Sequence, residues 1–230
     1  LALVAERKPL SGEVARVKRS TGLATRDYER ERDVILSARK KAIELDVAPD
    51  LAEELMRLLI RNSLTTQEQA SVSSIGTGSG RRVLLIGGAG KMGGWFAEFL
   101  STQGFAVGVA DPNGAPAGFT HVADWRQTDL KHDYIICATP LSVTDAILRD
   151  LALRRPPGVV LDVGSLKSPL RAGLQALKSH GLRVTSIHPM FGPDTELLSG
   201  RHVIFVDLGC DEALQRAKEQ FASTMAEQVV

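Results

Sequence analysis

Glycines with one acidic residue downstream form the strongest chemical signal in this sequence. The motif Gly88-Ala-Gly90-Lys91-Met92-Gly93 follows the apolar run 82–87, and Asp111 ends a second apolar run over 106–110. Glycines at this spacing let a phosphate approach the main chain at the start of a helix, where free N–H groups and the helix dipole attract negative charge. A carboxylate at the end of the second strand accepts hydrogen bonds from ribose hydroxyls and repels a 2′-phosphate. The pattern therefore predicts a dinucleotide site that takes NAD rather than NADP.

Each glycine of this motif has an expected task. Gly88 allows the tight turn out of the strand, Gly90 leaves room for a pyrophosphate beside the main chain, and Gly93 lets the helix pack closely on the strand. We expect the cofactor contacts to come from this motif, from the acidic residue and from the end of a third strand: Gly88, Gly90, Lys91, Met92, Gly93, Asp111, Thr139 and Pro140.

Polar residues follow two further predicted strands at the same edge of the sheet. Ser165 and Lys167 come after the apolar run 158–163, and His188 comes after the run 183–187. The carboxyl ends of parallel strands form the ligand-binding edge of such a sheet. Because an imidazole titrates near neutral pH, we expect His188 to act as a general base, with Ser165 bonded to it or to a substrate hydroxyl. Lys167 is expected either to lie near carboxylate or phosphate groups or to cap its loop.

A second set of polar residues stands at helical spacing in the first third of the chain: Arg7 with Lys18, Asp27 with Arg30 and Glu31, and Ser63 with Gln67. Members of each group share one face of a helix, because they are separated by about one turn or about three turns. By spacing alone they are either the lining of a polar site or solvated faces with helix ion pairs. Pro9 lies between the first two residues and predicts a kink that disturbs their alignment.

The elements that must position these residues fall into two regions. Residues 1–69 are charged and glycine-poor, with apolar residues three and four apart, which predicts a small all-α helical region with one helix start near Pro49. Glycine and serine over residues 70–80 predict a flexible linker. Over residues 81–230 strands and helices alternate, which predicts a Rossmann-type doubly wound parallel sheet. The fold class is therefore α/β, preceded by a helical region.

The expected elements of the second region can be given by residue range. The predicted strands are 82–87, 106–110, 133–138, 158–163, 183–187 and 202–207. The predicted helices are 91–102, 142–152, 168–179 and 211–225.

Composition excludes several classes of protein. The formal net charge of +1 and the mixture of both signs leave no basic surface for nucleic acid. No apolar run has the length of a membrane span. The two cysteines, Cys137 and Cys210, form no disulfide framework, which indicates a reducing, cytoplasmic setting. We expect no metal.

The strand-end residues resemble a known family. Asp162-Val-Gly-Ser-Leu-Lys167 followed by His188-Pro-Met-Phe-Gly192 is similar to prephenate dehydrogenase, over about residues 81–230. The resemblance implies oxidative decarboxylation of prephenate to 4-hydroxyphenylpyruvate, with hydride passing to NAD. It also implies that His188 draws the proton from the ring hydroxyl and that Ser165 supports this histidine. The family carries a further helical C-terminal domain, which we expect to be missing from this chain.

The helical region resembles the all-helical chorismate mutase family over about residues 1–67. The resemblance rests on Glu6-Arg7, Val14-x-x-Val17-Lys18, Arg26-Asp27-x-x-Arg30-Glu31-Arg32 and Ser63-x-x-x-Gln67. It implies the following roles: a carboxylate bound by Arg7, the ether oxygen of chorismate bound by Lys18 and Gln67, carboxylates held by Arg30 and Ser63, and the ring hydroxyl met by Asp27 and Glu31. The family dimerises through an entwined first helix, so the resemblance implies a homodimer in the full-length protein.

Mutase followed by dehydrogenase is the order of a bifunctional enzyme of tyrosine biosynthesis, in which the first product is the second substrate. The chain lacks an initiator Met and ends without a helix cap, so we expect truncation at both ends. Three alternatives remain open. One is a dehydrogenase for arogenate, the aminated relative of prephenate. Another is a 3-hydroxyacid dehydrogenase, which shares Gly-x-Gly-x-Met-Gly but does not explain the segment from His188 to Gly192. The third is a non-catalytic module that senses NAD or a metabolite of the pathway.

Overall fold

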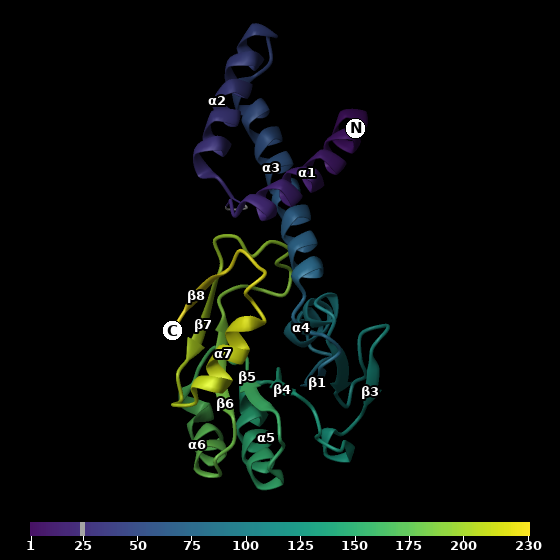
Figure 1. The fold of residues 1–230 in the computed structure, drawn as a ribbon, viewed down its shortest axis with the longest axis vertical. Helices are drawn as coiled ribbons and strands as arrows, with labels where there is room; N and C mark the ends of the chain where they lie inside the picture. The colour runs from purple at the N-terminus through teal and green to yellow at the C-terminus, as the bar shows by residue number, and fades with distance from the viewer. Residues whose placement is uncertain (24–25) are drawn as a thin grey trace. The chain divides into compact units, whose positions relative to one another are not determined.

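The computed structural model describes residues 1–23 and 26–230, with the side chain of Arg19 outside that description. The chain divides into two compact units, Leu1–Val72 and Ser73–Val230. The first unit is helical, and the second is a sheet with helices on both faces (Figure 1).

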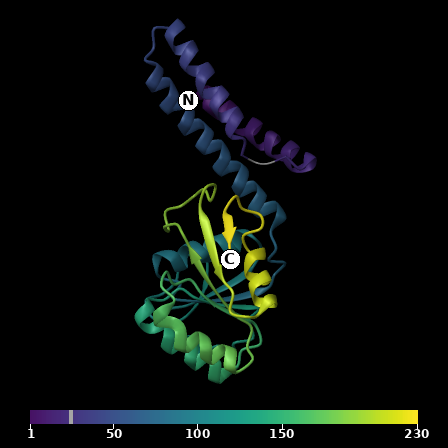
Figure 2. The same ribbon diagram turned by 90° about the vertical axis from the view of Figure 1, so that its left-hand side faces the viewer.

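Three helices make up the first unit: α1 (Ala2–Thr21), α2 (Tyr28–Glu44) and α3 (Pro49–Ile75). Asp27 begins α2, because its carboxylate accepts a hydrogen bond from the Arg30 N–H at 2.9 Å. The helix start predicted near Pro49 is confirmed by α3. The second and third helices lie side by side in both views (Figures 1 and 2), where Arg39 of α2 bonds two acidic residues of α3.

Pro9 does not separate Arg7 from Lys18, in contrast to the expectation from the sequence. The helix α1 continues through Pro9 from Ala2 to Thr21. Proline lacks the N–H of an ordinary helical residue, which leaves the helix one hydrogen bond short. Two residues later, the Ser11 hydroxyl donates to the Arg7 carbonyl at 3.1 Å, which adds a side-chain contact within the same helix. Arg7 and Lys18 consequently line the same cavity.

The segment 70–80 differs from the flexible linker that its composition predicts. Residues 70–75 belong to α3. The following glycines are bonded to the turn after α4: the Gly78 N–H donates to the Gln103 carbonyl, and the Gly80 N–H donates to the Gly104 carbonyl, both at 2.9 Å. A Cβ atom on Gly78 would collide with the main chain at Gly104. Glycine here permits close approach of two backbones rather than freedom of motion.

Eight strands form one sheet in the order β3-β2-β1-β4-β5-β6-β7-β8. Their bounds are Arg82–Ile86 (β1), Ala106–Ala110 (β2), Thr120–Val122 (β3), Tyr134–Cys137 (β4), Val159–Asp162 (β5), Val184–Pro189 (β6), His202–Val206 (β7) and Glu227–Val229 (β8). The predicted doubly wound sheet is confirmed, with all neighbouring strands parallel except β6 and β7, which are antiparallel. The short strands β3 and β8 lie outside the predicted set because three residues carry little periodic signal.

Helices cover both faces of this sheet: α4 (Lys91–Thr102), α5 (Leu141–Arg154), α6 (Arg171–Ser179) and α7 (Asp211–Glu219), with short 3-10 turns η1 (Trp125–Gln127) and η2 (Ser168–Leu170). Two hydrophobic cores lie on the two faces of the sheet. The first lies between the sheet and helices α4 and α7. The second lies between the sheet and helices α5 and α6, which lie together on one side in Figure 2. Along β1, Val83 and Leu85 face the first core while Leu84 and Ile86 face the second. Burial on both faces explains why the strands read as continuous apolar runs.

Helix α7 ends six residues earlier than predicted. The Gln220 carbonyl accepts a hydrogen bond from the Gln103 side chain at 3.0 Å, and Phe221 is completely buried beside the rings of α4. These tertiary contacts replace the last helical turns that local periodicity favours. None of the described helices is long and apolar enough to cross a membrane.

Candidate active sites

The turn after β1 contains three glycines, Gly87, Gly88 and Gly93, where a side chain would meet neighbouring atoms at less than 3 Å. Gly87, with φ of 89°, makes the tight turn that the sequence assigned to Gly88. Gly88 instead packs against β2, because a Cβ there would lie 2.5 Å from Val109 Cγ1. A side chain on Gly93 would collide with the Gly87 carbonyl oxygen, so this glycine allows α4 to approach the strand. Gly90 is exposed at the start of α4 and leaves the main chain open.

Asp111 lies beside this turn at the end of β2. Its carboxylate is 7% exposed and accepts hydrogen bonds from the Ala89 N–H at 3.2 Å and the Asn113 N–H at 2.9 Å. Lys91 is the exposed first residue of α4, and Met92 packs partly on the core. A bare main-chain turn, a helix start and a fixed carboxylate together fit the pyrophosphate and ribose of a dinucleotide.

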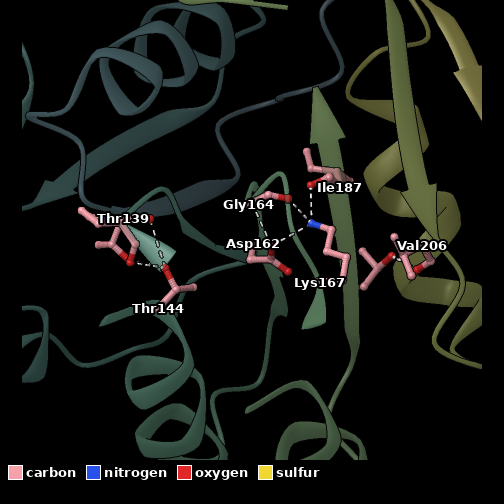
Figure 3. Close-up of polar contacts among 9 residues, drawn as sticks. Thr139, Thr144, Asp162, Gly164, Lys167, Ile187 and Val206 are labelled. Carbon is pink, nitrogen blue, oxygen red and sulfur yellow. Dashed lines mark hydrogen bonds and ion pairs between the residues drawn. The ribbon is translucent and has the colours of Figure 1, made fainter. Parts of the chain in front are cut away.

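The end of β4 borders the same turn. A Cβ on Gly87 would lie 2.8 Å from Thr139 Cγ2, so the two strand ends are in contact. Pro140 caps α5. The hydroxyls of Thr139 and Thr144 lie 2.8 Å apart, and Thr144 Oγ1 is 3.0 Å from the Thr139 carbonyl oxygen (Figure 3). Because β1 lies between β2 and β4, these ends meet where the strand order reverses, which is the usual ligand position in this kind of sheet.

His188 is the second-last residue of β6 and is partly buried. Burial lowers the pKa of its imidazole, and the nearby Lys167 ammonium lowers that pKa further. The ring is therefore neutral at neutral pH and able to accept a proton. Ser165 lies exposed on the loop after β5, and within the described residues no hydrogen bond joins it to His188. The predicted contact between these two side chains is thus not formed in this structure.

Lys167 joins the loop after β5 to the end of β6. Its ammonium lies 2.9 Å from Asp162 Oδ1 and 2.8 Å from the Ile187 carbonyl oxygen (Figure 3). The structure places the lysine beside the Asp162 carboxylate and bonds it to the Gly164 carbonyl of its own loop.

Aromatic residues hold the segment that follows His188. The rings of Phe191 and Trp95 have centroids 4.9 Å apart, and Trp95 Nε1 donates to the Thr195 carbonyl at 3.0 Å. Trp95 belongs to α4, so the helix of the dinucleotide turn also supports the His188 loop. Sequence reasoning missed this link, because nothing local connects positions 95 and 195.

The helical unit contains a cavity of about 150 Å³ that gathers every polar residue selected from its sequence. The lining residues come from α1, the start of α2, and α3: Arg7, Lys18, Asp27, Arg30, Glu31, Val34, Ile60, Ser63, Leu64 and Gln67. Three cationic side chains with hydroxyl and amide groups suit a small molecule that carries carboxylates. Apolar Val34, Ile60 and Leu64 were missed, because they look like ordinary core positions.

Arg7 is held in this cavity by α3. Its Nη1 donates to the Leu59 carbonyl at 2.6 Å and to Ser63 Oγ. The Ser63 hydroxyl also lies 3.0 Å from Ser11 Oγ, which is buried one turn beyond Arg7. Ser11 was not selected from the sequence, although its spacing of four from Arg7 is a usable signal.

The acidic residues of the cavity are positioned by the start of α2. Asp27 caps the helix, as described above, and Glu31 follows one turn later. The Arg26 guanidinium donates hydrogen bonds to both carboxylate oxygens of Glu31, at 2.9 and 3.1 Å. This ion pair raises the pKa of Arg26, chiefly through its hydrogen bond to Glu31. Arg26 precedes α2 and Glu31 lies within it, so this ion pair does not follow helical spacing and could not be predicted from the periodicity of the sequence.

Gln67 has a buried polar atom at the cavity that lacks a partner in the described part of the chain. The side chain is only 7% exposed, and its Oε1 has no hydrogen-bond partner among the described residues. A buried polar atom without a partner is costly, so its place in a polar cavity suggests that a ligand or water completes its bonding. Among the described residues no group of three or more His, Cys, Asp or Glu could hold a metal ion.

Comparison with protein families assigns both regions. Residues 1–68 match chorismate mutase type II, and residues 108–230, more than half of the chain, match the nucleotide-binding domain of prephenate dehydrogenase. The T-protein of Enterobacter agglomerans is 33% identical over 96% of this chain and 56% of its own length. The T-protein of Haemophilus influenzae is 26% identical over 90% of this chain and 52% of its own length. The chain thus spans about half the length of these relatives.

Solved structures agree on the fold of the second unit. An imine reductase from Myxococcus stipitatus in complex with NAD+ has a TM-score of 0.54 and 16% identity, and the match covers 65% of this chain and 54% of the reductase. At this identity the likeness concerns the fold alone. Through residues 108–230 the chain belongs to the prephenate dehydrogenase family, with a segment of the chorismate mutase type II family before them.

Proposed function

We propose that this chain contributes two successive steps of tyrosine biosynthesis. The helical unit rearranges chorismate to prephenate, and the sheet unit oxidatively decarboxylates prephenate to 4-hydroxyphenylpyruvate with NAD. The observation that carries the proposal is the helical cavity, because all seven polar residues expected of a mutase line it. The family match of the sheet unit and the position of His188 at its ligand edge support the second step.

The mutase chemistry needs no nucleophile. A pericyclic rearrangement is accelerated by holding the reactive conformer and by donors aimed at the charge that develops on the ether oxygen. Arg7 and Arg30 bind the carboxylates, while Lys18 and Gln67 hydrogen-bond the ether oxygen. Ser63 fixes Arg7, and Arg26 keeps the Glu31 carboxylate turned to one position near the substrate hydroxyl.

In the dehydrogenase step, His188 takes the proton of the ring hydroxyl as the carbonyl forms. The turn from Gly87 to Gly93 would hold NAD, which would supply the acceptor for the hydride from the same ring carbon. The carboxylate on the opposite ring carbon departs as carbon dioxide, its bonding electrons complete the aromatic ring, and His188 returns the proton to the phenolate oxygen. Asp111 holds the ribose hydroxyls and excludes a 2′-phosphate. Ser165 lies exposed on the loop after β5, at the ligand edge of the sheet, and hydrogen-bonds the substrate hydroxyl.

Separate assays on the full-length protein test this proposal. We expect loss of chorismate without added cofactor, and NADH formation only when prephenate and NAD are both present. NAD is expected to bind more tightly than NADP in a fluorescence titration. Arogenate serves as the comparison substrate in the second assay. Cofactor binding without turnover of any of these substrates would instead favour a sensing module.

We further propose that the helical unit pairs with a second copy of itself. Leu3, Leu10 and Val17 stand seven residues apart on α1 and are 78%, 59% and 54% exposed. An apolar stripe of this kind is costly in water and suits a self-complementary interface. Sedimentation of the full-length protein is expected to give a dimer at micromolar concentration. Leu10→Glu should weaken the association and the exposed Glu13→Gln should not, whereas a monomeric parent protein would contradict the proposal.

Both cysteines, Cys137 and Cys210, are free thiols. Free thiols support a reducing compartment, so the proposed site of action is the cytoplasm.

A further inference from the structure

Lys167 has an unusual environment for a lysine. Its ammonium is surrounded by three oxygen acceptors: Asp162 Oδ1 at 2.9 Å, the Gly164 carbonyl at 2.5 Å and the Ile187 carbonyl at 2.8 Å. An ammonium has three N–H donors, so every one of them is used. Figure 3 shows the amino group pointing into the space between the loop after β5 and the end of β6. The side chain is consequently fixed rather than mobile.

The acceptors lie next to the two residues expected to act on substrate. Ile187 directly precedes His188 in β6, and Gly164 directly precedes Ser165 in the loop after β5. The third acceptor, Asp162, is completely buried, and its Oδ1 also accepts from the Gly164 N–H at 2.9 Å. One ammonium therefore ties together the main-chain segments that carry His188 and Ser165.

Lys167 also sets the charge near the imidazole. Burial lowers the pKa of the His188 ring, and the positive charge of Lys167 lowers that pKa further. Strand β7 places the uncharged Ile204 opposite His188 in the sheet. The acidic residue of β5, Asp162, forms an ion pair with Lys167. Burial in turn lowers the pKa of Lys167, and Asp162 opposes that change.

We propose that Lys167 is a positioning residue of the dehydrogenase site, which fixes the His188 strand end and the Ser165 loop to each other and places a positive charge near the imidazole. This inference rests on the proposed function, since it assumes that His188 is the base. Lys167 needs no contact with substrate or cofactor to act in this way, because its three bonds go to the protein itself.

Two variants separate the effect of the Lys167 charge on His188 from the effect of its hydrogen bonds on the position of the two main-chain segments. Lys167→Met alone leaves Asp162 buried without its cation and risks misfolding, so the charge is removed in the double variant Asp162→Asn with Lys167→Met. Lys167→Arg retains the charge, but a planar guanidinium cannot direct three donors to the points that one ammonium reaches. Lys178→Met, at an exposed position on α6, removes the same charge elsewhere and is the control.

The first measurement is an NMR titration of the histidine rings without substrate or NAD, in which the His188 signal is assigned by its loss in His188→Asn. The double variant is expected to titrate at higher pH than the parent protein. Lys167→Arg and Lys178→Met should titrate like the parent. An unchanged His188 titration in the folded double variant would overturn the electrostatic part of the proposal.

The second measurement is the pH profile of dehydrogenase turnover in the full-length protein. The double variant and Lys167→Arg should both lose turnover, by up to about 10²-fold, because small displacements of a base are costly. Only the double variant should move the acid limb upward. Turnover like that of Lys178→Met in both variants would overturn the positioning role. If His188→Asn itself retained turnover, the assignment of the base would fail instead, and the two failures are thereby distinguished.

Discussion

Replacement of His188 by Asn is expected to lower dehydrogenase turnover by roughly 10²–10⁴-fold, the usual contribution of a general base. Asparagine keeps a polar side chain of similar size but cannot accept the proton of the substrate hydroxyl. NAD affinity should remain nearly unchanged, because His188 is not part of the proposed cofactor site, which consists of the turn from Gly87 to Gly93 and Asp111. Stopped-flow measurement of NADH formation, with a separate NAD titration, tests both statements.

The matched control is His180→Asn. His180 ends α6, and its ring bonds the Ala176 carbonyl at 2.8 Å, before the chain enters β6. It therefore lies at the amino end of the strand whose carboxyl end carries His188. Turnover in the control, and mutase activity in both variants, should match the parent protein. Equal dehydrogenase turnover in parent and His188→Asn would remove this histidine from its assigned role.

The pH dependence of the same reaction follows from the environment of His188. Burial and Lys167 lower the pKa of the ring, so the neutral base persists below the ordinary imidazole value of about 6.5. Turnover should therefore hold steady as pH falls through mildly acidic values and decline only when the lowered pKa is crossed. An acid limb above the ordinary value would contradict this environment.

Replacement of Gln67 by Leu is expected to lower mutase turnover by about 10²–10³-fold, as when one donor to a developing oxyanion is removed. The amide is buried at the cavity, where such a donor acts in a low dielectric. Leucine has a similar volume and removes only the polar group. The rate of chorismate loss in ultraviolet absorbance is the measurement, and Gln69→Leu, at an exposed position two residues on, is the control.

Gln67→Glu provides a sharper test of the same role. An amide donates a hydrogen bond at every pH, so the parent mutase should have flat activity from mildly acidic to neutral pH. A carboxyl group donates only when protonated, so the Glu variant should gain activity as pH falls. A steep change in the parent enzyme that disappears in Gln67→Leu would count against the amide as the donor.

Several features of the fold could be predicted because they depend on near neighbours in the chain. The apolar runs of the central strands are buried on both faces, so their composition alone marks them. The spacing of Arg7 and Lys18 follows from the pitch of one helix. The helix start near Pro49 similarly depends on a local signal, because proline suits the first turn of a helix.

Other features depend on residues far apart in the chain. Composition made 70–80 look flexible, yet Gly78 and Gly80 bond the turn at Gln103 and Gly104. Local reading assigned the tight turn to Gly88, but packing against Val109 gives Gly88 another task and leaves the turn to Gly87. The antiparallel direction of β7 likewise has no local signature.

The sequence by itself determined the chemical groups of both sites, because residue type and periodic spacing are local properties: glycines before a helix, a histidine after a strand, cations on helix faces. Only the tertiary structure decided how those groups are held. Ser63 fixes Arg7, and the Lys167 ammonium joins the loop after β5 to the end of β6. Such contacts form when chain folding brings distant backbone segments within hydrogen-bonding range, and no local pattern records which segments will meet.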